Sequence, residues 1–377
     1  MRWPSHLSII DTMTIRDIYA RQKQKRRRFI GIMVILILVS SFAGLCIGSV
    51  MVSPQDVLVT LGHMLFPDQI AEPGRWQEAV VFRIYAPRIV LAAFTGFSLA
   101  IAGTVMQSTL RNPLVSPFTL GLSSAAGFGA ALAIVLIPAA LGGAALDLVL
   151  GPVSYKLSSL LTVCSAFFFG LLSIGIVLVI GRKRSTSRSI MILSGVIIGY
   201  LFQAGITALK YISNDAALRE ITEWLMGGMW GADWNSVVIV VPVTLVCAIL
   251  IIKDSQVFNA ITSGDDVAKT LGIDIDRFRR RSLVIVTLSS SVCLAFTGII
   301  GFIGLMAPHI CRMIIGNDQR FLVPASGLLG AMILLVSDTV ARTVLAPIEI
   351  PVGVIMYVLG GAFFIYLIMR KGREAMD

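Results

Sequence analysis

Charged side chains are scarce in this chain of 377 residues. They occupy 14% of the positions, against about a quarter in soluble domains, whereas hydrophobic residues occupy 56% and mean hydropathy is +0.87. Apolar runs of roughly 18 or more residues recur along the whole sequence, and each is long enough to cross a hydrocarbon core about 30 Å thick. This composition excludes a soluble globular protein and predicts an all-α, polytopic membrane protein.

Motifs for metal binding and for nucleotide hydrolysis are also missing. The sequence has no CxxC or CxxH spacing and no G-x-x-x-x-G-K-[ST] phosphate loop. We therefore expect that this chain is not an enzyme and that it holds no metal or cofactor of its own. The five cysteines stand singly in apolar stretches and are interpreted as small buried side chains; they are Cys46, Cys164, Cys247, Cys293 and Cys311.

Ten apolar segments are predicted to span the membrane as helices. The first follows a basic run at residues 21–28. It is about twice as long as the apolar region of a signal peptide, and no A-x-A-like cleavage site follows it. The ten segments cover residues 29–50, 88–108, 118–137, 157–180, 190–211, 236–252, 283–301, 302–315, 322–340 and 353–369.

The distribution of apolar and basic segments divides the chain into three parts. Residues 1–28 are expected to form a basic cytoplasmic extension, residues 29–370 the transmembrane domain, and residues 371–377 a short cytoplasmic tail. Residues 253–281 are the only long hydrophilic segment on the predicted inside, and we expect them to fold into short helices. On the predicted outside, residues 51–82 are expected to pack as a cap or a short helix.

Basic residues determine the predicted orientation. With both termini inside, 24 of the 31 Lys and Arg residues lie on the inside, whereas the 21 acids divide into ten inside and eleven outside. Because Lys and Arg orient membrane proteins, we expect both termini in the cytoplasm and the chain in the inner membrane. The net charge of +10 is spread over short segments between apolar runs, so it is not interpreted as nucleic-acid binding.

Ionisable side chains near the middle of spans are almost absent, although proton- or ion-coupled transport usually needs them. Asp338 and Arg342 are four residues apart and able to pair on one helical face, but they lie at the outer end of a span. His309 is the only histidine within a span and is interpreted as structural. An ion-coupled secondary carrier is therefore disfavoured but stays open, as does a non-transporting membrane scaffold or sensor.

Six separated segments carry short motifs in a fixed order. They are APR (86–88), Q…RNPLVSP (107 and 111–117), WLMGG (224–228), SGDDVAKTLG (263–272), GFIGLMAPHICR (301–312) and D…R…EIPVG (338, 342 and 349–353). This series resembles FecCD-type permeases, the membrane subunits of ABC importers for iron siderophores, haem and cobalamin. The resemblance covers about residues 83–370 and implies the fold of a type II ABC importer permease, with about ten transmembrane helices per subunit.

The resemblance also implies a function and partners. The chain is expected to be the permease subunit of an importer that moves an iron chelate, a siderophore or haem, by alternating access; cobalamin is the alternative cargo. The implied partners are a second copy or a related permease, two cytoplasmic ATPase subunits that hold ATP and Mg, and an extracytoplasmic substrate-binding protein. Membrane lipid is a further expected partner, and nucleic acid is not.

Arginines at the outer surface are implied to dock the binding protein, because charge-assisted pairs orient docking partners. Arg88 and Arg342 match the family's positions. Tyr85 stands where the family usually has a further arginine, and Arg83, two residues earlier, is expected to substitute for it.

The family's cytoplasmic gate and its coupling segment match inner parts of the chain. The expected gate residues are Asn112, Leu114, Ser185 and Thr186, and residues 111–117 read equally well as a turn fixed by proline. The expected coupling segment is a short helix that receives movement from the ATPase and stops at a glycine. Its residues are Ser263, Gly264, Asp265, Asp266, Ala268, Leu271 and Gly272.

Overall fold

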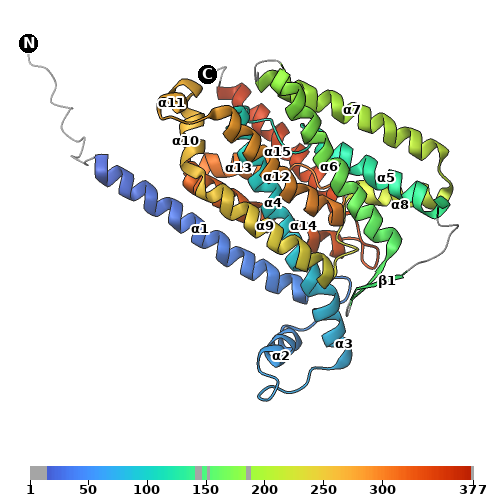
Figure 1. Cartoon of the computed structure of the whole chain (residues 1–377). Helices are drawn as coiled ribbons and strands as arrows, with labels where there is room; N and C mark the ends of the chain where they lie inside the picture. The colour runs from blue at the N-terminus through green and yellow to red at the C-terminus, as the bar shows by residue number, and fades with distance from the viewer. Residues whose placement is uncertain (1–14, 141–146, 151–152, 184–187, 375–377) are drawn as a thin grey trace, which may run out of the picture.

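The computed structural model describes residues 15–140, 147–150, 153–183 and 188–374, which form a helical bundle with one short hairpin (Figure 1). The first half of the predicted N-terminal extension and the last three residues of the tail lie outside this range. The elements are α1 (Ile15–Cys46), α2 (Pro54–Leu65), α3 (Arg75–Glu78), a π-helical segment η1 (Ala79–Tyr85), α4 (Ala86–Leu110), α5 (Leu122–Ala140), β1 (Asp147–Leu150), β2 (Val153–Lys156), α6 (Leu157–Lys183), α7 (Arg188–Ile212), α8 (Asp215–Met226), α9 (Trp234–Lys253), α10 (Ser255–Ser263), α11 (Asp265–Thr270), α12 (Ile275–Thr297), α13 (Ile303–Ile315), α14 (Gln319–Thr343) and α15 (Val352–Glu374).

The predicted spans correspond to helices in the described part of the chain. Eight helices are long and apolar enough to cross a membrane, and α5 and α13 are shorter apolar helices. This confirms the all-α membrane fold and its ten apolar segments. Helix α12 begins at Ile275, eight residues before the predicted start, because the Asp274 side chain accepts a hydrogen bond from the Arg277 N–H and caps the helix.

The bundle has two distinct ends. Helices α2 and α3 lie at one end, called the α2 end, and α10 and α11 lie at the other, called the α10 end (Figure 1). The short helix expected in the long first connection is α2, which is capped by the Ser53 hydroxyl and has Pro54 at its first position. Helix α8 also lies at the α2 end, since Trp234, shortly after it, donates to the Phe82 carbonyl of η1 at 3.0 Å.

Helix α4 lies at the centre of the bundle and packs closely on α14 (Figure 1). A Cβ added at Gly96 would lie 2.3 Å from the Gly330 carbonyl oxygen, and one added at Gly330 would lie 2.5 Å from the Ala100 Cβ. The small residues Gly96 and Ala100, one turn apart on α4, therefore let the two helix backbones approach closely.

Helices α5, α6 and α7 pack beside this centre through aromatic and small side chains. Phe128 of α5 lies 5.1 Å from Phe169 of α6 and 5.5 Å from Phe202 of α7, between ring centroids. Gly195 of α7 meets the chain before α5, where an added Cβ would lie 2.6 Å from the Leu120 Cα. Apolar side chains on the far sides of α7 and α15 stay exposed on the single chain; they include Tyr200, Leu201, Val358 and Ile368.

Candidate functional site

Four charged side chains form a buried cluster at the α2 end. Arg88 of α4 lies with its Nη2 3.0 Å from Asp338 of α14 and with its Nη1 2.7 Å from Glu349, in the connection to α15. Arg342, one turn after Asp338, lies with its Nε 3.2 Å from the same carboxylate. Two cations and two anions thus compensate each other, which a buried charge requires.

Further bonds tie the cluster to α1 and to the segment before α4. Arg342 donates to the Gly44 carbonyl oxygen at 3.1 Å, and its guanidinium lies over the Tyr85 ring, 4.7 Å from the centroid. The Tyr85 hydroxyl donates to the Val50 carbonyl oxygen at 2.8 Å. The cluster therefore joins α1, α4 and α14 at the α2 end.

The predicted surface position of Arg88 and Arg342 is wrong. Their exposed fractions are 5% and 0%, because Asp338 and Glu349 lie within reach and pair with them inside the chain. The docking role given to these two arginines stays untested, and their burial leaves no face for direct contact. Arg83, in contrast, is exposed on η1.

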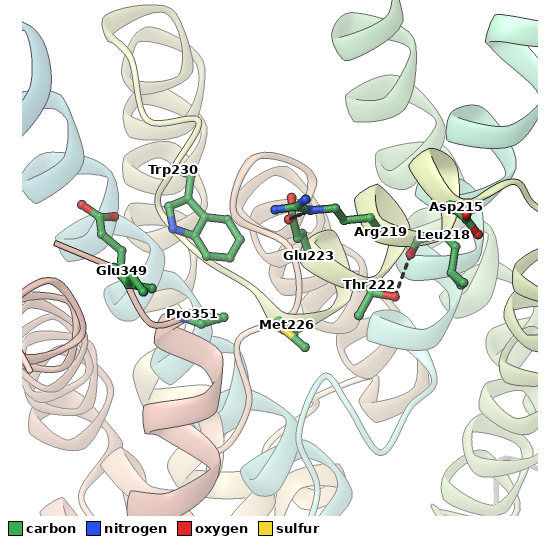
Figure 2. Close-up of a pocket in the computed structure, with 10 residues that line it drawn as sticks. Asp215, Leu218, Arg219, Thr222, Glu223, Met226, Trp230, Glu349 and Pro351 are labelled. Atoms are coloured by element: carbon green, nitrogen blue, oxygen red, sulfur yellow. Dashed lines mark hydrogen bonds and ion pairs between the residues drawn. The ribbon is translucent and has the colours of Figure 1, made fainter. Parts of the chain in front are cut away.

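A pocket of about 780 Å³ lies beside the cluster at the same end. Helix α8 forms one wall, and residues 348–351 before α15 form another (Figure 2). Trp230 lies between Glu349 and the ion pair of Arg219 with Glu223, whose Nε and Oε1 atoms are 2.9 Å apart. The walls mix apolar and charged side chains: Asp215, Leu218, Arg219, Thr222, Glu223, Met226, Trp230, Ile348, Glu349 and Pro351.

Glu349 connects this pocket to the buried cluster. Its carboxylate lines the pocket, binds Arg88, and accepts a hydrogen bond from the Ser49 hydroxyl at 2.9 Å. Burial opposes its ionisation, but the hydrogen bond and charge of Arg88 outweigh burial and hold the pKa of Glu349 below its ordinary value. Sequence analysis did not assign a site role to Glu349, since Arg88 is 261 positions away in the chain.

The predicted gate turn lies at the α10 end. Arg111 adopts a left-handed conformation (φ 49°), and the Asn112 side-chain oxygen accepts a hydrogen bond from the Leu114 N–H at 2.9 Å. The Asn112 side chain therefore stabilises the turn, in which Leu114 is 63% exposed, and the gate role of these two residues stays a prediction. Ser185 and Thr186 lie outside the described residues.

Residues 253–281 contain the short helices α10 and α11, as expected, and the predicted coupling segment covers the end of α10 and the whole of α11. Gly264 separates α10 from α11, and Gly272, at φ +75°, ends α11 by donating to the Lys269 carbonyl oxygen at 2.9 Å. Ala268 lies on the buried face of α11, whereas Leu271, just after the helix, is 66% exposed. The segment thus presents an apolar side chain at the α10 end.

Two carboxylates anchor this segment to the bundle. Asp265, the first residue of α11, pairs with Arg188 at the start of α7, with 2.5 Å between Nη2 and Oδ2. Ser263 is the last residue of α10 and Asp266 the second of α11, so the predicted residues are contiguous in space as in sequence. The pair joins the coupling segment directly to α7.

Asp318 is the second anchor, and sequence analysis missed it. It caps α14 and binds Arg26 of α1 at 2.9 Å, Arg320 at 2.8 Å and Asn259 of α10 at 3.0 Å. Partial burial alone would raise its pKa, but the hydrogen bonds from Arg320 and Asn259 outweigh burial and lower the pKa of Asp318 to about 2. Arg320 is two residues away, but Arg26 and Asn259 are distant in the sequence, so no local pattern shows that Asp318 joins three helices.

Comparisons with known proteins agree with this arrangement. The sequence profile of the FecCD transport family matches residues 34–370. An ABC transporter permease of Methanocaldococcus jannaschii is 37% identical over 95% of this chain and 99% of that protein. The hemin transport system permease of Yersinia pestis is 35% identical over 77% of this chain and 83% of that protein. The vitamin B12 import system permease of Salmonella arizonae is 33% identical over 94% and 98%, respectively. A solved metal-chelate type ABC transporter in an inward-facing conformation gives a TM-score of 0.76 at 26% identity, covering 91% of this chain and 99% of that chain.

Proposed function

The chain belongs to the FecCD transport family, and we propose that it imports an iron chelate, a ferric siderophore or haem, across the inner membrane by alternating access. It is a multi-pass membrane protein and the permease subunit of an ABC importer for iron chelates, haem or cobalamin. The observation that carries the proposal is the family match over residues 34–370, which includes the second half of the first apolar span and the whole of the other nine. The similarity to a hemin permease supports an iron chelate as cargo, and the similarity to a vitamin B12 permease makes cobalamin the alternative.

In the proposed orientation, the α2 end faces outward and both termini lie in the cytoplasm. The excess of Lys and Arg at the α10 end supports it. A substrate-binding protein delivers the chelate at the α2 end, where Arg83 is the exposed arginine that we assign to docking. A second permease copy covers the exposed apolar sides of α7 and α15, and two ATPase subunits, which hold ATP and Mg, contact α11.

The proposed movement starts at the coupling segment. ATP binding in a partner shifts α11, and the pair of Asp265 with Arg188 passes the shift to α7. Helix α8 follows α7 after two residues and forms a wall of the 780 Å³ pocket, so this route reaches the outward-facing pocket. The proposed work of this chain is conformational, and the chemistry of ATP hydrolysis belongs to the partner.

The test is uptake by proteoliposomes that contain this chain, its ATPase partner and its binding protein. We expect ATP-dependent uptake of a labelled ferric siderophore or haem, with no uptake in the absence of ATP. Arg83→Glu should reduce uptake by weakening docking, whereas Arg75→Glu, at an exposed arginine of the same end, should leave it unchanged. Uptake of cobalamin alone would select the alternative cargo. Uptake that follows an ion gradient and ignores ATP would overturn the proposal in favour of a secondary carrier.

A further inference from the structure

A second pocket, of about 480 Å³, lies at the α10 end between the gate turn and the coupling segment. Arg111 and Asn112 line it from the turn, Ser263 from the end of α10, and Arg312 from the last turn of α13. The residues that line it include these two arginines and no Asp or Glu. The pocket is therefore positively charged on its walls.

The two arginines have no carboxylate partner within the described part of the chain. Arg312 donates to the neutral side-chain oxygen of Gln107 at 2.5 Å, and Arg111 forms no ion pair there. Asp318, which lies close by in sequence, is already bound to three other side chains. Guanidinium groups bind planar carboxylates through paired hydrogen bonds, so the pocket presents a charge and a geometry that a carboxylate complements.

Apolar side chains beside the pocket face water on the single chain. Leu114 is 63% exposed, Leu271 is 66% exposed, and Val267 is 47% exposed. Leu114 is two residues from Asn112, and Val267 is four residues from Ser263, so these exposed side chains belong to the same two segments that line the pocket. Exposed apolar side chains gathered at one place mark a surface that a partner protein covers.

We propose that the ATPase subunit covering α11 inserts an aspartate or glutamate side chain into this pocket, between Arg111 and Arg312. This inference rests on the proposed function, and it adds to the contact with α11 a second contact, at the pocket between the coupling segment and the gate turn. The negative charge of the inserted side chain complements the two arginines, and the coupling segment that borders the pocket is the part of the chain assigned to the ATPase.

The inserted carboxylate acts on the gate turn through a short path. Arg312 binds the Gln107 side chain, and the Gln107 carbonyl oxygen accepts a hydrogen bond from the Asn112 N–H at 3.1 Å. Gln107 also donates to the Gly304 carbonyl oxygen of α13 at 3.0 Å, which fixes its orientation. An ATPase that moves this carboxylate pulls the gate turn directly, in parallel with the movement of α11 and α7.

The experiment measures the Kd of the full-length permease in nanodiscs for its ATPase partner, as a function of salt concentration. Arg111→Glu should weaken binding about tenfold or more and flatten the dependence of log Kd on log salt, because it replaces attraction with repulsion. Arg111→Lys should stay within about threefold of the wild type, since it keeps the charge. Arg27→Glu, at an exposed arginine of α1, is the matched control and should leave Kd unchanged.

Arg312→Gln tests the other wall of the pocket and should weaken binding by a similar factor. Because Arg111 is exposed, its variants should fold normally, and they test the inference even if Arg312→Gln does not fold. Equal Kd and equal salt dependence for the wild type and Arg111→Glu would overturn the inference. A second result would also overturn it: inorganic phosphate raises the melting temperature of the wild type but not of Arg111→Glu, and Arg111→Glu binds the ATPase with an unchanged Kd. The pocket would then be a phosphate site. A wild-type chain that binds no ATPase would instead contradict the proposed function itself.

Discussion

The block formed by α1, α4 and α14 differs from the sector formed by α5, α6 and α7 in the forces that hold it together. In the block, charged clusters around Asp318 and Asp338 clamp both ends, and the contact of Gly96 with Gly330 closes the middle. In the sector, the described contacts are mainly aromatic rings and small residues, and the ion pair of Arg188 with Asp265 leads out of it to the coupling segment. The proposed route through α7 requires the sector to move relative to the block, and the charged clusters of the block provide a way to test this.

Removal of Asp338 from the block should lower the stability of the folded chain more than any other change considered. Asp338→Ala removes one of the two carboxylates that compensate Arg88 and Arg342 inside the chain. This loss should lower the free energy of unfolding by about 3–5 kcal/mol. The midpoint of thermal unfolding in detergent micelles measures the loss. Asp215→Ala, at an exposed carboxylate of α8, is the control and should cost less than about 1 kcal/mol. Equal losses for the two variants would show that the charged cluster around Asp338 does not hold the block together.

A larger side chain at Gly330 should have the next largest effect. Gly330→Leu drives side-chain atoms into the backbone of α4 and should cost about 3 kcal/mol, at the upper end of overpacking penalties. The control is Gly361→Leu, because an added Cβ at Gly361 meets no atom within 4 Å. The same unfolding midpoint gives both values, and tolerance of leucine at Gly330 would show that α4 and α14 are able to separate.

Loss of Asp318 should have a smaller effect, with a defined pH dependence. Asp318→Ala removes hydrogen bonds to two arginines and should cost about 1.5–3 kcal/mol at pH 7. Because the pKa of Asp318 falls from 3.8 to about 2 in the folded chain, this stabilisation is complete above pH 3.8 and is lost as pH falls through about 2. Melting curves of wild type and variant should therefore converge below pH 2, and a constant difference at all pH values would refute the assignment.

Arg188→Ala should have the smallest effect on stability and a clear effect on coupling. Its pair with Asp265 is about 29% exposed on both sides, so its loss should cost less than about 1 kcal/mol. If α7 receives the movement of α11 through this pair, the amount of chelate taken up per ATP should fall while ATPase binding persists. Unchanged uptake per ATP would remove α7 from the proposed route.

Local patterns in the sequence were sufficient to predict the apolar helices that span the membrane. Continuous apolar runs identify the spans, and the spacing of Asp338 and Arg342 correctly predicts their pairing on one helical face at 3.2 Å. Gly272 likewise ends α11 as its sequence context predicts. Helix α8 was not predicted, although Asn214 caps it and Leu218, Ile221 and Leu225 recur at helical spacing.

The sites depend on contacts between distant residues, which local patterns do not record. From its position at the edge of a span, Arg88 was predicted to lie at the surface. In the fold it is buried, because Asp338 and Glu349 pair with it. Asp318 reads as a simple helix cap, yet its partners Arg26 and Asn259 come from two other helices. The gate turn and the coupling segment were both identified by family resemblance, but only the fold brings Asn112 and Ser263 to one pocket.

The pairing of Arg88 with Asp338 also imposes an order on biosynthesis. The two residues are 250 positions apart, so at about 5–20 residues per second the ribosome makes Asp338 roughly 12–50 s after Arg88. During that interval Arg88 has no internal anion, and it is close enough to the end of its helix to keep its guanidinium in the interfacial water. Asp338 and Arg342 are one turn apart on the same helix, so α14 is able to form that pair by itself. Because both carboxylates that bind Arg88 come from α14 and the segment after it, we expect the burial of Arg88 to follow the docking of α14.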